Sequence, residues 1–143
     1  MPKQILMCPP TYFDIEYEIN VWMHQDDQPT GETAQEQWDK LHAIYTDKLG
    51  WDVELIDPVK GLPDMVFATD CCLKVGDKIL LSSFRFSERQ PETGHFEKWF
   101  KDQGYQSVYV LQGGIWNLRW ASHNIKGKQF LQDLVVNVPE QNQ

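Results

Sequence analysis

Two carboxylates, Asp64 and Asp70, lie six residues apart on either side of a short apolar run, Met65-Val-Phe67. If this run is a strand, the even offset puts both side chains on the same face. Two carboxylates on one face suit a planar guanidinium, which donates paired hydrogen bonds to carboxylate oxygens. The spacing therefore predicts a candidate guanidinium site. The alternative is purely structural, with Asp64 in a turn and Asp70 at the strand end.

Two carboxylates this close repel each other unless a cation lies between them. Arg85 and Arg89 follow the pair closely enough in sequence to supply that cation themselves. If they do, the pair is structural. If they point elsewhere, we expect a small guanidino compound to bind weakly, with a Kd no better than about 1 mM.

The thiols favour structural roles. The chain has three cysteines, Cys8, Cys71 and Cys72, with no CxxC spacing. An odd count without a secretion signal argues against a disulfide scaffold, and adjacent cysteines seldom pair with each other. We therefore expect buried structural cysteines, no metal site and no cofactor.

Charge and hydropathy limit the partners. The net charge is −8, and the lysines form no basic stripe, so nucleic acid is a poor partner. No stretch reaches the roughly 18 apolar residues of a membrane span. The first apolar run is too short for a signal peptide, so we expect a cytoplasmic protein with no membrane contact.

The pattern of apolar residues predicts an α/β fold (α+β), with residues 1–143 forming a single domain. Gly50 and Gly104 stand where a glycine would end each helix. The expected helices cover residues 33–49 and 92–103. The expected strands cover residues 4–8, 51–57, 65–75, 78–83 and 105–111.

A repeat relates the two halves. Leu49-Gly-Trp-Asp-Val53 matches Gln103-Gly-Tyr-Gln-Ser-Val108 with one insertion, and the glycines are offset by 54 residues. A repeat of about that length holding strands, a helix and another strand indicates a modular architecture.

Four motifs in this order resemble the amidinotransferase and dimethylarginine dimethylaminohydrolase superfamily of guanidino-modifying enzymes. They are Met7-Cys-Pro-Pro-Thr-Tyr-Phe-Asp14, Ile19-Asn-Val-Trp-Met23, Leu62-Pro-Asp-Met-Val-Phe67 and Phe84-Arg-Phe-Ser-Glu-Arg89. The resemblance implies the pentein fold, in which five ββαβ modules surround a pseudo-fivefold axis. It implies two such modules here, a partial α/β-propeller made of residues 3–58 and 62–112, followed by a divergent C-terminal extension at 113–143.

The resemblance also implies roles for individual residues. Asp64 matches an aspartate that contacts substrate, and Asp70 matches the acid that holds the guanidinium. Arg85 or Arg89 falls where relatives bring an arginine toward a substrate carboxylate. Gln112 stands in the position of a glutamate that helps to bind the guanidinium, which is a degenerate form of the family motif.

The family's catalytic histidine and cysteine come from later modules and are not matched here. We therefore expect a truncated, non-catalytic protein with a weak guanidino- or cation-binding site and no catalytic residues. An open propeller exposes strand edges, so we also expect a homodimer. One alternative is an enzyme completed across the dimer, with Cys71 or Cys72 as nucleophile and His95 or His123 as base. Another is a protein-interaction module without a small-molecule site.

Overall fold

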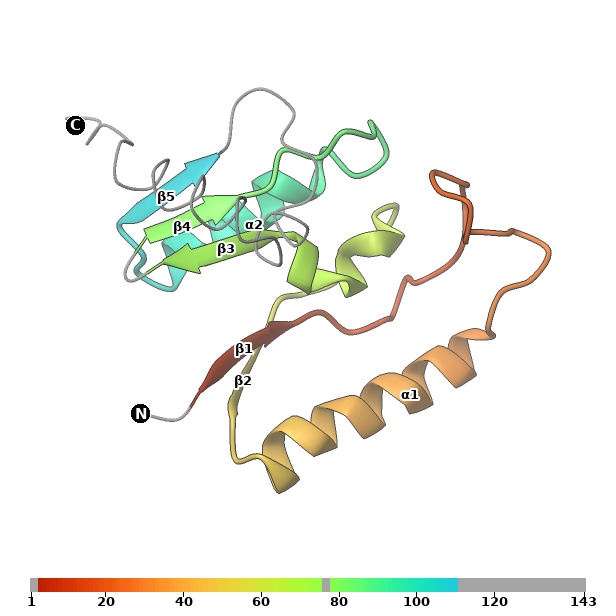
Figure 1. Cartoon of the computed structure of the whole chain (residues 1–143), viewed down its shortest axis with the longest axis horizontal. Helices are drawn as coiled ribbons and strands as arrows, with labels where there is room; N and C mark the ends of the chain where they lie inside the picture. The colour runs from red at the N-terminus through yellow and green to blue at the C-terminus, as the bar shows by residue number, and fades with distance from the viewer. Residues whose placement is uncertain (1–2, 76–77, 111–143) are drawn as a thin grey trace. The chain divides into compact units, whose positions relative to one another are not determined.

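The computed structural model describes residues 3–75 and 78–110 (Figure 1). The chain divides into two compact units, Met1–Thr69 and Asp70–Gln143, and each is described by itself. The predictions for the turn at 76–77, for Gln112 and His123, and for the extension at 113–143 fall outside the described residues. Among the described residues, no helix combines the length and apolar character that a membrane crossing needs.

In the first unit, a helix connects two strands that pair in parallel. Strand β1 (Gln4–Met7) pairs with β2 (Asp52–Leu55), and helix α1 (Gly31–Ala43) lies between them in sequence. A single π-helical turn, Ile44–Lys48, prolongs α1. Within residues 3–69 one strand precedes the helix, where a ββαβ module has two, so the module proposed at 3–58 stays a prediction.

The ends of α1 follow from local chemistry. The side-chain oxygen of Thr30 accepts a hydrogen bond from Thr33 N at 3.2 Å, so the helix begins at Gly31, before the predicted position 33. Gly50 follows the last turn with φ 60°, a conformation that favours glycine. The predicted helix and its glycine stop are confirmed, and only the start moves.

The predicted strand at 65–75 is wrong over its first part. Pro63–Val66 and Ala68–Asp70 form 3-10 turns, and strand β3 begins at Cys72. Pro63 fixes its own φ in the first position of a turn, and Phe67 N donates to the carbonyl oxygen of Asp64 at 2.9 Å. Because these bonds are local, the apolar run coils instead of extending.

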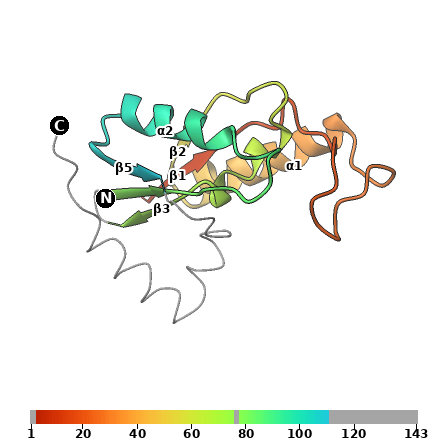
Figure 2. The same ribbon diagram turned by 90° about the horizontal axis from the view of Figure 1, so that it is seen from above.

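The second unit has the element order ββαβ. It contains β3 (Cys72–Val75), β4 (Lys78–Leu81), α2 (Glu92–Asp102) and β5 (Ser107–Val110). Strand β4 lies in the centre of the sheet, antiparallel to β3 and parallel to β5. Figures 1 and 2 show α2 along one face of this sheet. The helix predicted at 92–103 and the strands predicted at 78–83 and 105–111 are confirmed within three residues.

The core of the second unit lies between α2 and β4. Ile79, Leu80 and Leu81 are fully buried, as expected for the central strand of a sheet. Phe96 and Phe100 are one turn apart on α2, so both side chains face the sheet and are buried. In contrast, α1 of the first unit has no buried residue. The helix of the second unit is therefore the better packed of the two, which suits it to hold the side chains of a site in place.

Candidate functional site

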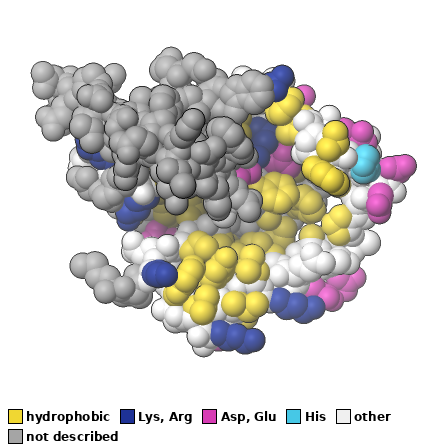
Figure 3. Space-filling view, viewed as in Figure 1, with side chains coloured by type: hydrophobic (Ala, Val, Ile, Leu, Met, Phe, Trp, Pro, Cys, Tyr) yellow, Lys and Arg dark blue, Asp and Glu magenta, His cyan; other side chains and the backbone are white. Residues whose placement is uncertain are grey.

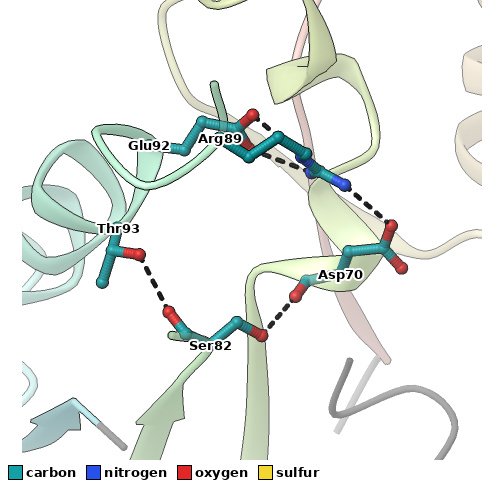
Figure 4. Close-up of polar contacts among 5 residues, drawn as sticks. All are labelled: Asp70, Ser82, Arg89, Glu92 and Thr93. Atoms are coloured by element: carbon teal, nitrogen blue, oxygen red, sulfur yellow. Dashed lines mark hydrogen bonds and ion pairs between the residues drawn. The ribbon is translucent and has the colours of Figure 1, made fainter. Parts of the chain in front are cut away.

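Asp70 takes part in a buried ion triad within the second unit (Figure 4). Arg89 Nη1 lies 3.3 Å from Asp70 Oδ2, and Arg89 Nε and Nη2 donate to the two carboxylate oxygens of Glu92 at 2.9 and 3.0 Å. The exposed fractions of the side chains are 16% for Asp70, 11% for Arg89 and 0% for Glu92. One guanidinium therefore bridges two carboxylates in a largely dry environment.

An aromatic ring covers the guanidinium as well. The centroid of the Phe84 ring lies 4.3 Å from Arg89 Cζ, within the range of a cation–π interaction. Arg89 is thus contacted by carboxylates at its edges and by a ring at its face, and its position is strongly restrained.

The main chain of Asp70 is held by a second set of contacts, also drawn in Figure 4. Ser82 Oγ donates to the Asp70 carbonyl oxygen at 2.5 Å, and Ser82 N donates to the Cys71 carbonyl oxygen at 2.8 Å. Thr93 Oγ1 donates in turn to the Ser82 carbonyl oxygen at 2.8 Å. The end of β4 and the first turn of α2 therefore hold the backbone at Asp70.

One oxygen of Asp70 has no donor. Asp70 Oδ1 is buried and makes no hydrogen bond to any part of the chain that the structure describes. A buried carboxylate oxygen without a donor costs free energy, which a ligand N–H placed there would recover. The carboxylate is thus half satisfied, by Arg89 at Oδ2.

Asp64 belongs to the first unit and lies in the turn Pro63–Val66, with 3% of its surface exposed. The predicted arrangement of Asp64 and Asp70 on one strand face is wrong, because the residues between them form turns. The role of Asp64 in ligand contact stays a prediction.

The structure separates the two candidate arginines. Arg89 lies between carboxylates of its own chain, whereas Arg85 is exposed in the segment between β4 and α2. Its guanidinium carbon is 5.4 Å from the centroid of the Phe86 ring. The sequence reasoning missed Glu92. Its spacing of three residues from Arg89, at the start of a helix, was the available signal.

Two of the three cysteines are buried, as we expected for structural cysteines, and the third is not. Cys8 and Cys71 are buried, and Cys72 is half-buried. Hydrogen bonding to Cys72, with burial, raises the pKa of Cys71. The hydrogen bond from Cys71, aided by nearby Lys74 and opposed by burial, lowers the pKa of Cys72. His95 is exposed on α2. No cluster of metal-binding side chains occurs among the described residues.

A separate apolar cavity of about 300 Å³ lies in the first unit, between β1, α1 and the turn around 66–69. Figure 3 shows hydrophobic side chains gathered beside α1 on this face. Trp38 Nε1 is buried there without a hydrogen-bond partner in the described ranges. The residues lining the cavity include Leu6, Phe13, Trp38, Leu41, Tyr45 and Phe67.

No family model matches the chain. It is 45% identical over 112 residues to the bifunctional arginine dihydrolase/ornithine cyclodeaminase ArgZ of Synechocystis sp., covering 76% of this chain and 15% of ArgZ. It is 37% identical over 106 residues to the N(G),N(G)-dimethylarginine dimethylaminohydrolase of Mycobacterium tuberculosis, covering 74% of this chain and 35% of that protein. The chain thus spans about a third or less of the length of these relatives.

The fold is similar to a solved structure from the same group. The crystal structure of the N-terminal domain of ArgZ bound to product, an arginine dihydrolase from cyanobacteria, superimposes with a TM-score of 0.69 at 42% identity. The match covers 78% of this chain and 40% of that one.

Proposed function

Because the chain is a homologue, over about three quarters of its length, of members of the amidinotransferase and dimethylarginine dimethylaminohydrolase superfamily, we propose that it binds a guanidino compound weakly at Asp70 and does not catalyse a reaction by itself. We also propose that β3–β4–α2–β5 is one pentein module, the second of two in a partial propeller. The ββαβ order of these elements supports that assignment.

The state of the Asp70 carboxylate carries the proposal. Oδ2 already accepts a guanidinium N–H from Arg89, while Oδ1 is buried without a donor among the described residues. Asp70, Arg89 and Glu92 together carry a formal charge of −1, which favours a second cation beside Asp70. A guanidinium from a ligand supplies both the missing N–H and the missing positive charge.

The same geometry limits the affinity. Arg89 occupies one of the two oxygens, so a ligand guanidinium gains one strong hydrogen bond at Asp70 where an unoccupied carboxylate would offer two. We therefore expect a Kd of about 1 mM or weaker, or roughly −4 kcal/mol. Exposed Arg85 is the candidate partner for a carboxylate on the ligand.

The arrangement of the described thiols and of His95 supports the non-catalytic part. A cysteine nucleophile is activated by a base in hydrogen-bond reach. Cys8 and Cys71 are buried, the hydrogen bond that shifts the pKa of Cys72 comes from Cys71, and His95 is exposed on α2. We expect no turnover of arginine, methylated arginines or agmatine by the purified chain.

A second candidate function rests on Cys72. Its lowered pKa favours the thiolate, the form in which a cysteine attacks an electrophilic carbon. An enzyme completed across a dimer, with Cys72 as nucleophile, would use that property. Turnover that is abolished by Cys72→Ser would establish this candidate and refute the non-catalytic proposal.

An NMR titration tests binding. Arginine and agmatine are added to the wild type, to Asp70→Asn, and to Asp52→Asn as a matched control at an exposed aspartate of β2. We expect saturable shifts near Asp70 in the wild type and the control, with loss of saturation in Asp70→Asn. Equal shifts in all three proteins, or none in the wild type, would contradict a guanidino site at Asp70 and favour the interaction-module alternative.

A further inference from the structure

We propose that Glu92 and Thr93, two consecutive residues in the first turn of α2, are positioning residues that hold Asp70 ready for a ligand. The inference rests on the proposed function and adds the part of the chain that controls the site. Glu92 acts on the side chain of Asp70 through Arg89, and Thr93 acts on its main chain through Ser82 (Figure 4). We call Asp70, Ser82, Arg89, Glu92 and Thr93 the Asp70 network.

The side-chain branch depends on a two-point contact. Both carboxylate oxygens of Glu92 accept hydrogen bonds, from Nε and Nη2 of Arg89 at 2.9 and 3.0 Å. A contact of this kind fixes the plane of a guanidinium as well as its position. With that plane fixed, Nη1 reaches Oδ2 of Asp70 at 3.3 Å.

This geometry keeps Arg89 from covering the whole Asp70 carboxylate. An arginine that is not held elsewhere prefers to contact a carboxylate with two parallel N–H groups. Such a shift would supply a donor to Asp70 Oδ1, the oxygen that the structure leaves without one among its described residues. The pull of Glu92 on Arg89 therefore keeps the buried Oδ1 without a donor from Arg89, and the proposed function assigns that hydrogen bond to the guanidinium of a ligand.

The main-chain branch reaches the same residue from the other side. Thr93 Oγ1 donates to the Ser82 carbonyl oxygen at 2.8 Å, and Ser82 Oγ donates to the Asp70 carbonyl oxygen. Ser82 is 1% exposed, so both bonds are partly shielded from water, which strengthens them. The start of one helix thus restrains both the backbone and the carboxylate of Asp70.

Glu92→Gln tests the side-chain branch, because glutamine keeps the size of the side chain and removes its charge. Glu97→Gln is the matched control, a neutralisation on the same helix that breaks an exposed pair with Lys101. Two measurements are made by NMR on each folded protein. The first is the Kd for arginine, and the second is the set of three-bond couplings that report the χ1 angle of Asp70 without ligand.

We expect Glu92→Gln to weaken arginine binding by at least about fivefold and to change the Asp70 couplings, while Glu97→Gln matches the wild type. Thr93→Val, which removes only the hydroxyl, is expected to weaken binding by about twofold. A folded Glu92→Gln protein with the wild-type Kd and wild-type couplings would overturn the inference. If the wild type does not bind arginine, the proposed function fails, and the Asp70 couplings alone then decide whether Glu92 positions Asp70.

A purely structural role is distinguished by the same data. In that case Glu92→Gln lowers the midpoint of urea unfolding but leaves the couplings and the Kd unchanged, and the inference is wrong. If Glu92→Gln does not fold, Glu92→Asp replaces it, because a shorter carboxylate keeps the charge and loses the two-point contact. Unchanged Asp70 couplings in Glu92→Asp and in Thr93→Val would then overturn the inference.

Discussion

Replacing Arg89 with methionine removes the guanidinium between Asp70 and Glu92 and keeps an unbranched apolar stem in its place. Three hydrogen bonds are lost, at 2.9, 3.0 and 3.3 Å. Removing one partner of a buried ion pair costs about 3–5 kcal/mol, because it leaves an uncompensated buried charge. Glu92 is 0% exposed and Asp70 is 16% exposed, so the figure for a buried ion pair applies to the contacts that Arg89 makes with them.

A smaller effect acts in the opposite direction. Methionine sulfur next to the Phe84 ring recovers about 0.3–1.5 kcal/mol, comparable to the cation–π contact that it replaces. The two aromatic contributions therefore nearly cancel, and the lost ion pairs decide the result. We expect Arg89→Met to lower the free energy of unfolding by about 3–4 kcal/mol at pH 7.

Urea unfolding followed by circular dichroism measures this change. Lys98→Met is the matched control, because it breaks an exposed ion pair with Asp102 on α2, where the lysine side chain is 75% exposed. Exposed pairs contribute about 0–1 kcal/mol, so the control is expected to unfold almost as the wild type does. Surface substitutions usually change the free energy of unfolding by no more than about 0.5 kcal/mol. If the free energy of unfolding of Arg89→Met lies within that margin of the wild-type value, the reasoning from the buried triad is refuted.

Three further predictions concern other parts of the chain. Gly50→Ala is expected to lower the free energy of unfolding of the first unit by about 1 kcal/mol, because a φ of 60° is unfavourable for alanine. No atom crowds the added Cβ, so no steric cost is added, and an unchanged urea midpoint would contradict this prediction. The lowered pKa of Cys72 predicts that its alkylation by iodoacetamide accelerates at a lower pH than that of an ordinary cysteine. Cys71→Ala is expected to move that pH upward, because it removes the hydrogen bond that stabilises the Cys72 thiolate. The mass of the wild type in solution by light scattering is expected to be twice the 16.8 kDa of one chain, since Trp22 and Val21 are 87% and 76% exposed; a monomer at micromolar concentration would rule out the homodimer.

Local chemistry in the sequence was enough for the helices and for much of the second sheet. Helical spacing placed the apolar residues of both helices, and Gly50 and Gly104 marked their ends, where both have positive φ. These signals depend on neighbours within one or two turns, so they are readable without the fold. The family resemblance was also available from the sequence, because motif order survives in the chain itself.

The site depended on contacts that the sequence does not display. By composition, the short apolar run after Asp64 fits a strand or a turn equally well. The fixed φ of Pro63 and the hydrogen bonds within the run favour the turn. The expected pairing on one strand face failed for that reason. The sequence left open that Arg89 pairs with Asp70, which would make the pair structural, and the structure shows that pairing at Oδ2. Only Oδ1, which has no donor among the described residues, leaves room for the guanidino site that we propose.

Glu92 shows why the tertiary structure was needed. In sequence it is an acidic residue at the start of a helix, a place where a solvent-exposed carboxylate is common. Its two-point contact with Arg89, three residues earlier, is local, whereas its complete burial cannot be seen in the sequence. Burial and charge pairing between residues as far apart as Asp70 and Arg89 arise only when the sheet and the helix pack together, because neither element alone excludes water from the pair.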